Sequence, residues 1–399
     1  MSDADPLPGS SRAGAQLLIV GGSTRAAAYS ALRSGIQPIC ADLFGDCDLQ
    51  LHSAVISVDN YPAGLPDSLT GLSPLPWVYT GGLENHAAIV EQISANHRLL
   101  GNDAAALGFV RDPFWISREL REAGFPALDV RAQPEFLHAT GWLRKPRSGA
   151  GGQGIEVWHP ELAPVIEECY FQQRIAGEPI SAQFLATPDG VEFLGAVRQL
   201  VGLTAANTPT RFTWCGGIFP AELARGTIET MTAIGRHLAR AGHLRGLFGC
   251  DFIVSNDVPW LTEVNPRYTA AMELLEHRVG VSLIGRHIAA CNAFNPRGPD
   301  SLSHAPASDW CSSIASQGVV GKVVLFAGQD SIAEDARALL IGPRDDRLPF
   351  VADLPFPGQR IPAGQPVCTL FAPERHFEAC LSRLVRCAKQ YHRSFLRPV

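Results

Sequence analysis

Two carboxylates and one amide share a short stretch of the sequence. Residues 249–267 read GCDFIVSNDVPWLTEVNPR, which predicts two strands joined by a tight turn. Glu263 and Asn265 stand two residues apart on the second strand, so their side chains point to the same face. Asp251 on the first strand can meet them across the hairpin. Two carboxylates and an amide oxygen are hard ligands, which suit a Mg²⁺ ion that bridges nucleotide phosphates.

Arg267 continues the same alternating face, where its planar guanidinium could bind a phosphoryl group. Each of these residues also has a plainer explanation. A strand aspartate such as Asp251 usually faces solvent, and Asn265 before Pro266 is most often part of a turn. Arg267 could simply close the loop after Pro266. The joint pattern is harder to obtain by accident than any of its parts.

A glycine-rich stretch lies about a hundred residues upstream. Residues 144–155 read RKPRSGAGGQGI. Lys145 precedes the glycines, whereas a P-loop places its lysine after them, and the following residues alternate like a strand, whereas a dinucleotide fingerprint opens a helix. We therefore predict a hairpin of strand, Lys145, glycine loop and strand. Most glycine-rich stretches are ordinary loops, but backbone N–H groups in such a loop can approach phosphate oxygens.

The elements that must position these residues differ along the chain. The first hundred residues predict a β-α-β opening that is typical of a doubly wound α/β domain, with strands at 16–20, 36–42, 54–58 and 77–80 and helices at 25–33 and 85–99. After Asp112, which should cap a helix, we expect an α+β layout of hairpins with helices at 113–123, 221–240, 268–277 and 281–292. A closing helix is expected from about residue 374.

Composition narrows the class of protein. The chain has 399 residues, 46 % hydrophobic and 18 % charged, which indicates two or three globular domains. The net charge is −6, and there is no basic run that would suggest nucleic-acid binding. The ten cysteines form no CxxC pair. Residues 1–15 contain no apolar core like that of a signal peptide, and no apolar run reaches membrane-spanning length. We expect a reduced, cytoplasmic protein that binds neither nucleic acid nor a membrane.

At EVNPR, residues 263–267, the sequence resembles the ATP-grasp superfamily, in which an acid, an asparagine and an arginine stand in this order. The resemblance covers the first 295 residues. It implies a Rossmann-like pre-ATP-grasp domain at 16–104 after a disordered leader at 1–15, and an ATP-grasp domain at 105–295 with a glycine-loop lid subdomain at about 113–175. A small β-rich C-terminal domain is expected at 316–399.

The resemblance also implies ligands and roles. ATP is expected with Mg²⁺, or with Mn²⁺ in its place; the metal ligands would be Asp251, Glu263 and Asn265, and Arg267 would be catalytic. The ATP-binding set would be Lys145, Ser148, Gly149, Gly151, Gly152, Gly154, Gln173, Ile175 and Glu178.

Some of these assignments leave alternatives open. Residues 170–178, YFQQRIAGE, resemble the hinge strand that holds adenine, but Gln173 stands where the family often has glutamate. Glu178 would bind the ribose hydroxyls or be a surface-turn residue. Arg111 would contact phosphate or, more often for such an arginine, lie at the surface. Residues 211–217 would face a substrate or be a packed strand.

Residues 22–31 and 41–48, GSTRAAAYSA and ADLFGDCD, resemble the carbamoyl-phosphate-synthase-like branch, which includes ligases associated with methanofuran and tetrahydromethanopterin C1 metabolism. Residues 352–369 resemble the closing domain of biotin-carboxylase-like enzymes. We expect an ADP-forming ligase that joins a small carboxylate, such as glutamate, to an amine through an acyl phosphate. A bicarbonate-using carboxylase and a non-catalytic nucleotide-binding module stay open, as does a homodimer.

Overall fold

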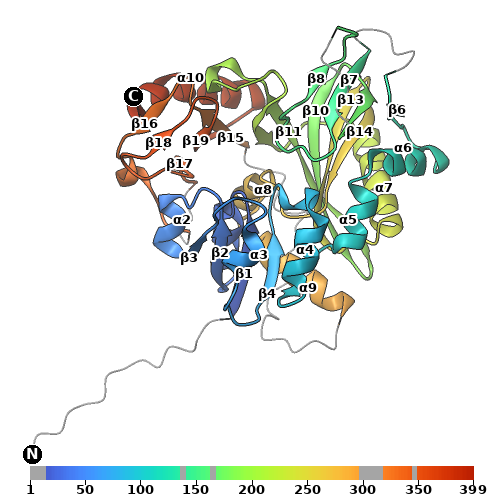
Figure 1. Cartoon of the computed structure of the whole chain (residues 1–399). Coiled ribbons are helices and arrows are strands. Elements are labelled where there is room, and N and C mark those ends of the chain that lie inside the picture. The colour runs from blue at the N-terminus through green and yellow to red at the C-terminus, as the bar shows by residue number, and fades with distance from the viewer. Residues whose placement is uncertain (1–14, 135–140, 162–167, 296–317, 344–347) are drawn as a thin grey trace, which may run out of the picture.

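The computed structural model describes residues 15–134, 141–161, 168–295, 318–343 and 348–399 (Figure 1). The leader predicted at 1–15 therefore lies, apart from Ala15, outside the described residues. Within these ranges no helix is both long and apolar enough to cross a membrane. The nine cysteines of the described part are free, and eight of them are buried, as expected for small core residues.

A five-stranded parallel sheet forms the N-terminal part, drawn in blue in Figure 1. Its order is β3-β2-β1-β4-β5, with bounds β1 (Gln16–Gly21), β2 (Gln37–Asp42), β3 (Ala54–Ser57), β4 (Pro76–Tyr79) and β5 (Arg98–Leu99). Residues 17–20 are fully buried, because helices cover both faces of such a sheet. The associated helices are α1 (Arg25–Arg33), α2 (Cys47–His52), α3 (Leu65–Ser68), η1 (Leu83–Asn85) and α4 (Ala87–Ser94). The predicted doubly wound opening is confirmed.

The helix predicted at 85–99 was too long. The α-helix α4 ends at Ser94, and residues 98–99 form the edge strand β5 instead. Backbone hydrogen bonds explain the difference. Arg98 N–H donates to Leu75 O (3.0 Å) and Leu100 N–H donates to Trp77 O (2.8 Å), so residues 98–99 pair with β4 as an edge strand and cannot continue the helix.

A second, four-stranded sheet carries the glycine-rich hairpin. Its order is β6-β9-β7-β8, with bounds β6 (Val130–Arg131), β7 (Trp142–Pro146), β8 (Glu156–Val157) and β9 (Cys169–Gln173). The strands β7 and β8 pair antiparallel, as predicted. Helices α5 (Ala104–Val110) and α6 (Pro113–Glu122) precede this sheet. The Asp112 carboxylate accepts a hydrogen bond from Phe114 N–H (2.9 Å), which confirms the predicted helix cap.

An eight-stranded antiparallel sheet runs through the centre of the molecule in the order β14-β13-β10-β11-β12-β15-β19-β17. The bounds are β10 (Glu178–Thr187), β11 (Gly190–Val201), β12 (Trp214–Phe219), β13 (Gly246–Ser255), β14 (Val258–Asn265), β15 (Val319–Phe326), β17 (Val351–Ala352) and β19 (Pro366–Glu374). The last three strands come from the C-terminal region, and β15 pairs directly with β12. One sheet thus joins residues 178–265 to residues 319–374.

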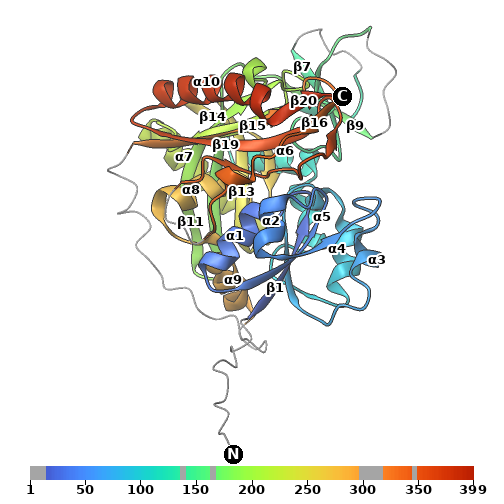
Figure 2. The same ribbon diagram turned by 90° about the vertical axis from the view of Figure 1, so that its left-hand side faces the viewer.

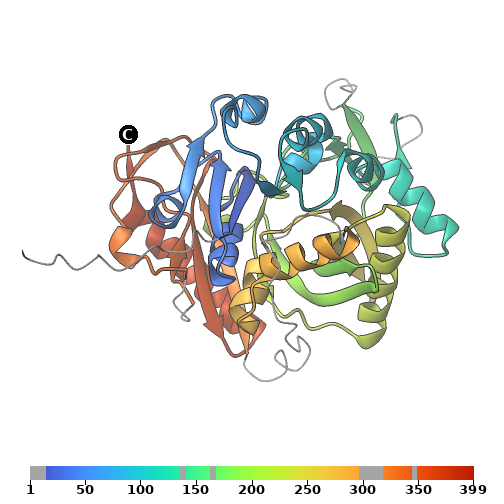
Figure 3. The same ribbon diagram turned by 90° about the horizontal axis from the view of Figure 1, so that it is seen from below.

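Helices cover both faces of this central sheet. They are α7 (Arg225–Ala241), α8 (Met272–Val279), α9 (Leu283–Phe294) and α10 (Phe377–Phe395). Along β10, Ile180, Ala182 and Phe184 pack in the cluster under α7, whereas Leu185 packs in the cluster with α9. Figure 3 shows α9 on the sheet strands, and Figure 2 shows α10 lying along β19.

The remaining elements are short. A three-stranded sheet consists of β16 (Ser331–Ala333), β18 (Arg360–Ile361) and β20 (Leu396–Pro398), and two short 3₁₀ turns are η2 (Thr204–Ala206) and η4 (Arg337–Leu339). The closing helix starts at Phe377, three residues later than predicted, because Glu374 is still the last residue of β19. The overall mixture of a parallel sheet followed by antiparallel sheets agrees with the predicted fold class.

Candidate active site

The β13–β14 hairpin brings the three predicted metal ligands together. Asp251 and Glu263 are direct partners across the two strands. One oxygen of Asp251 accepts hydrogen bonds from Ser181 Oγ (2.5 Å) and Gln199 Nε2 (3.2 Å). Its other oxygen accepts from Asn265 Nδ2 (3.0 Å). The hairpin therefore holds Asp251 and Asn265 in contact, with Glu263 on the neighbouring strand.

Asp251 is buried beside a second carboxylate, Glu263. Burial and the neighbouring Glu263 raise the pKa of Asp251 to about 6. No group of three or more acidic, histidine or cysteine side chains placed to hold a metal occurs in the described ranges. A divalent cation would therefore rest on these two carboxylates, the Asn265 amide and oxygens of a bound ligand. This set of hard oxygen donors fits Mg²⁺, which usually takes one or two carboxylates plus phosphate oxygens.

The raised pKa predicts a pH dependence of cation binding. Asp251 must lose its proton before it can bind a cation, and it keeps that proton up to about pH 6. Below that pH the Mg²⁺ affinity should fall about tenfold per unit, because each bound cation displaces one proton. Calorimetric titration of Mg²⁺ in the presence of ADP at several pH values measures this. The Asp251→Asn variant serves as the control, because any pH dependence of its Mg²⁺ affinity comes from protonation of ADP and not from Asp251. If wild type and this variant showed parallel pH profiles, the prediction would be contradicted.

Arg111 links this hairpin to the glycine loop. Its Nη1 donates to Glu263 Oε1 (2.7 Å) and to Val264 O (2.7 Å), and its Nε and Nη2 donate to Asn85 Oδ1 (3.2 and 2.7 Å). Asn85 Nδ2 in turn donates to Gly149 O (3.0 Å). The Arg111 side chain is only 13 % exposed. The interpretation of Arg111 as a surface arginine was therefore wrong.

Arg267 lies just beyond the end of β14 and is held by several partners. Its Nη2 donates to Glu84 Oε1 (2.5 Å) and to Asn265 Oδ1 (3.3 Å), and its Nη1 donates to Tyr268 O (3.2 Å). Burial would raise the pKa of Glu84, but the charge and hydrogen bond of Arg267, together with the charge of Arg111, outweigh it and lower that pKa. Two buried atoms of the pair, Arg267 Nε and Glu84 Oε2, have no partner among the described residues. Glu84 received no role from the sequence, although it lies in a stretch of polar and glycine residues after β4.

Lys145 points into a small cavity beside the hairpin. It is 8 % exposed, and its Nζ donates to Gln172 Oε1 (3.2 Å) and lies 5.7 Å from the centre of the Tyr170 ring. Although burial opposes it, the neighbouring Tyr170 and Glu263 raise the pKa of Lys145, so the ammonium stays charged. Lys145, Arg111 and Glu263 line one cavity of about 50 Å³ together with the glycine loop.

The glycine loop is folded down against β12. Gly151 O accepts a hydrogen bond from Trp214 N–H (3.0 Å). Gly152 approaches so closely that an added Cβ would lie 1.9 Å from Phe212 O, and its φ is +83°. Of the predicted loop residues, Gly149, Gly151 and Gly152 line the small cavity, whereas Ser148 and Gly154 line an adjoining one with Gly149.

The three predicted hinge residues lie outside the cavity that the lysine and the glycine loop share. Gln173, Ile175 and Glu178 do not line the cavity that holds Lys145. Gln173 N–H already donates to Asp129 O (2.8 Å). Glu178 lies half exposed at the start of β10 and forms an ion pair with Arg198 (2.7 Å). The structure thus brings the loop, lysine and hairpin residues together but leaves these three outside that group.

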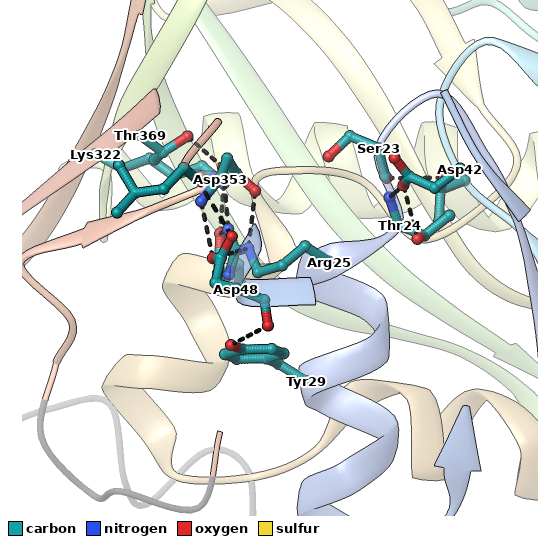
Figure 4. A network of polar contacts seen from close by, with 12 residues as sticks. Ser23, Thr24, Arg25, Tyr29, Asp42, Asp48, Lys322, Asp353 and Thr369 are labelled. Atoms are coloured by element: carbon teal, nitrogen blue, oxygen red, sulfur yellow. Dashed lines mark hydrogen bonds and ion pairs between the residues drawn. The ribbon is translucent and has the colours of Figure 1, made fainter. Parts of the chain in front are cut away.

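A larger cavity of about 500 Å³ adjoins the glycine loop and Arg267. Trp214, in the segment that could have faced a substrate, lines it. At its far end lies a buried network (Figure 4) in which Arg25 forms ion pairs with Glu273 and with Asp353 (2.8 Å), and Lys322 Nζ donates to Glu273 Oε2 (2.8 Å). These residues come from α1, α8, β15 and the segment after β17, so no local sequence pattern could have grouped them.

Comparison with known proteins supports the sequence resemblance. Residues 111–271 match the family model described as ATP-grasp domain. An uncharacterized protein of Methanocaldococcus jannaschii is 22 % identical over 311 residues, which cover 73 % of this chain and 68 % of that protein. The carbamoyl phosphate synthase large chain of Beutenbergia cavernae is 26 % identical over 162 residues, 35 % of this chain and only 14 % of that one. The predicted resemblance is confirmed.

Solved structures of similar fold cover nearly the whole chain. A biotin carboxylase–β,γ-ATP complex from Campylobacter jejuni is 16 % identical, with a TM-score of 0.66 and 94 % of each chain covered. The biotin carboxylase domain dimer of Hydrogenobacter thermophilus 2-oxoglutarate carboxylase, with MgADP, ADP and bicarbonate, is 13 % identical, with a TM-score of 0.67 and 95 % and 94 % of the chains covered. These similarities establish the fold.

Proposed function

The chain carries an ATP-grasp domain at residues 111–271, and on that premise we propose that it is an ADP-forming ligase that joins a small carboxylate to an amine. One observation carries the proposal: Lys145, Arg111, Glu263 and the glycine loop converge on one cavity. Arg267 lines the larger cavity directly beside that loop. A phosphate-sized site and a substrate-sized site thus share a wall.

Separate groups of residues would bind the phosphates, the metal ion and the adenosine. The loop N–H groups and Lys145 hold the phosphates of ATP, while Asp251, Glu263 and Asn265 hold Mg²⁺. The metal neutralises charge on the phosphate oxygens. Ser148, Gly149, Gly151, Gly152 and Gly154 belong to the loop part of this proposal, and the backbone at Gln173 and Ile175, with Glu178, to the adenosine part.

Arg267 would neutralise the charge that develops on the transferred phosphoryl group. A substrate carboxylate oxygen bonds to the γ-phosphorus as the bond to the ADP oxygen breaks. The amine nitrogen then bonds to the acyl carbon, inorganic phosphate leaves, and the nitrogen loses a proton. No nucleophile from the protein is required.

The size of the larger cavity favours an organic substrate. At about 500 Å³ it lies within the usual range for small-molecule sites. An amino acid such as glutamate is a suitable carboxylate.

A bicarbonate-using carboxylase is the second candidate, favoured by the similarity in fold to the Campylobacter jejuni and Hydrogenobacter thermophilus enzymes. The Hydrogenobacter thermophilus domain is a dimer. We propose that this chain also forms a homodimer, which light scattering of the purified protein can test.

The proposal is tested by a screen of amino acids against amines, scored by ADP release and product mass. A ligase releases ADP only when both an acid and an amine are present, and the product mass equals their sum less one water. ADP release that needs bicarbonate and no amine would favour the carboxylase. An intact protein that binds ATP without any turnover would point to a nucleotide-binding module.

Glu263→Gln should lower turnover at least tenfold, about 1.4 kcal/mol of barrier. The glutamine keeps the shape of the side chain but removes the charge that faces both the cation site and Arg111. Steady-state ADP release at limiting Mg²⁺ measures this. Glu156→Gln is a matched control, because Glu156 forms an ion pair with Arg144 but is half exposed on the lid. Equal turnover in both variants would remove Glu263 from the metal site.

A further inference from the structure

Asp46 is a buried carboxylate that has no hydrogen-bond or ion-pair partner among the residues that the structure describes. It is 8 % exposed and lines the 500 Å³ cavity. It stands at the position before α2, where an aspartate side chain normally accepts a hydrogen bond from the helix backbone. Here it accepts none from the helix, and no hydrogen bond or ion pair reaches its carboxylate from anywhere in the described part of the chain. The side chain therefore faces the cavity without a donor.

The other carboxylates around it are fully engaged (Figure 4). Asp42 accepts from the Thr24 N–H and hydroxyl on one oxygen and from two further backbone N–H groups on the other. Asp48 accepts from the N–H groups of residues 353 and 354. Asp353 binds Arg25 and the Thr369 hydroxyl (2.5 Å). Asp46 is thus distinguished from its neighbours by lacking any donor.

The charges at this end of the cavity do not balance. Among the described residues, Arg25 and Lys322 are the lysine or arginine side chains that pair with Asp48, Asp353 and Glu273, and neither pairs with Asp46. If all four carboxylates were ionised, two negative charges would be left over. Burial, and then the neighbouring aspartates, raise the pKa of Asp46 well above its usual range, which favours its protonated form. Buried charges in proteins are normally paired or bound to a ligand, so a cation from outside the chain would allow Asp46 to ionise.

We propose that Asp46 binds the ammonium group of a substrate in this cavity, with the Asp353 carboxylate adding to the attraction. Asp46 lacks both a hydrogen-bond donor and a positive charge beside it, and an ammonium group supplies both. Leu43, Phe44, Val324 and Val367 line the same cavity and would contact the apolar part of the ligand. The inference deepens the proposed ligase function, because it assigns a cationic group to one of the two substrates.

The ammonium group could belong to the amine acceptor or to the α-carbon of an amino-acid substrate. Both share the chemistry that Asp46 recognises, and a binding experiment separates them. Butylamine and 1-butanol have similar shapes and differ in charge, and L-glutamate represents the amino acid. Each probe is titrated calorimetrically into the full-length protein, with and without a non-hydrolysable ATP analogue and Mg²⁺.

We expect wild-type protein to bind butylamine or L-glutamate, and Asp46→Asn to bind the same probe at least tenfold more weakly. Asp46→Glu keeps the charge and should retain most of the affinity. A loss confined to butylamine identifies the acceptor subsite, and a loss confined to L-glutamate identifies the amino-acid subsite. 1-Butanol should bind weakly to every variant.

Asp67→Asn, a matched change at an exposed aspartate of the same region, should behave like wild type. Equal affinities in wild type and Asp46→Asn, or no binding of either ammonium-bearing probe to wild type, would overturn the inference. A failure of the ATP analogue to bind would instead count against the proposed ligase, because the probes are also titrated without nucleotide.

Discussion

Replacing Arg267 by lysine should lower turnover by about 10²–10³-fold, the usual effect of removing one transition-state donor, while ATP affinity stays within a few fold. The guanidinium reaches Glu84, Asn265 and the Tyr268 carbonyl at once and lines the larger cavity. A lysine ammonium is a single point of charge and cannot span these positions. ATP affinity, melting temperature and ADP release measured on one purified variant decide the outcome.

The competing explanation is that Arg267 only closes the structure through its buried pair with Glu84. That explanation predicts a lower melting temperature in Arg267→Lys with near-normal turnover in the folded fraction. Glu84→Gln provides the matched control, because it removes the partner and leaves the arginine in place. A well-folded Arg267→Lys protein that turns over like wild type would end the catalytic role.

Gly152→Ala should lower turnover by about 10²-fold, equivalent to about 2.7 kcal/mol, with little change in melting temperature. A Cβ at this position would lie 1.9 Å from Phe212 O, so the loop could not keep its contact with the start of β12. The left-handed backbone adds roughly 1–2 kcal/mol of strain for any residue with a side chain. Because the loop is a small, glycine-rich segment at the surface, opening it should not unfold the rest of the chain.

Gly151→Ala separates the two causes. Gly151 also has a left-handed φ of +60°, but nothing lies within 4 Å of an added Cβ. It should therefore show only the effect of strain, at most about 30-fold. Proteolysis of the loop in the presence of an ATP analogue gives a second readout, because a loop that cannot close stays open to cleavage. Equal losses in the two variants would show that contact with β12 is unimportant.

Local patterns predicted the parts of the fold that depend on neighbouring residues. The alternation of residues 249–265 gave the β13–β14 hairpin. The α1 helix falls at the predicted residues 25–33, and Gly35, with a positive φ, lies just beyond its end. The position of Lys145 before the glycines correctly indicated a hairpin loop. Lys145 and Glu263 line one cavity, as expected from the family resemblance, which placed both at the ATP site. Their roles stay predictions.

Contacts between distant residues were beyond such reasoning. Glu84 meets Arg267 across 183 positions, and Arg25 meets Asp353 across 328. Neither pair leaves a periodic signal, because each depends on how the parallel sheet and the central antiparallel sheet pack against one another. The surface interpretation of Arg111 failed for the same reason: its partners Asn85 and Glu263 lie far away in the sequence. The unpaired state of Asp46 could be recognised only once all surrounding donors had been placed.

The continuity of the central sheet limits how the protein can be divided. The strand β12 is an interior strand, because its residues 216–219 pair with residues 320–323 of β15. A fragment that stopped at residue 295 would turn β12 into an open edge, with the unpaired backbone groups of residues 216–219 exposed to other chains. Bare edges of this kind promote aggregation. The matched family segment at 111–271 is therefore not a unit that can be cut out and studied by itself, and a truncated gene product of this length should accumulate as insoluble material.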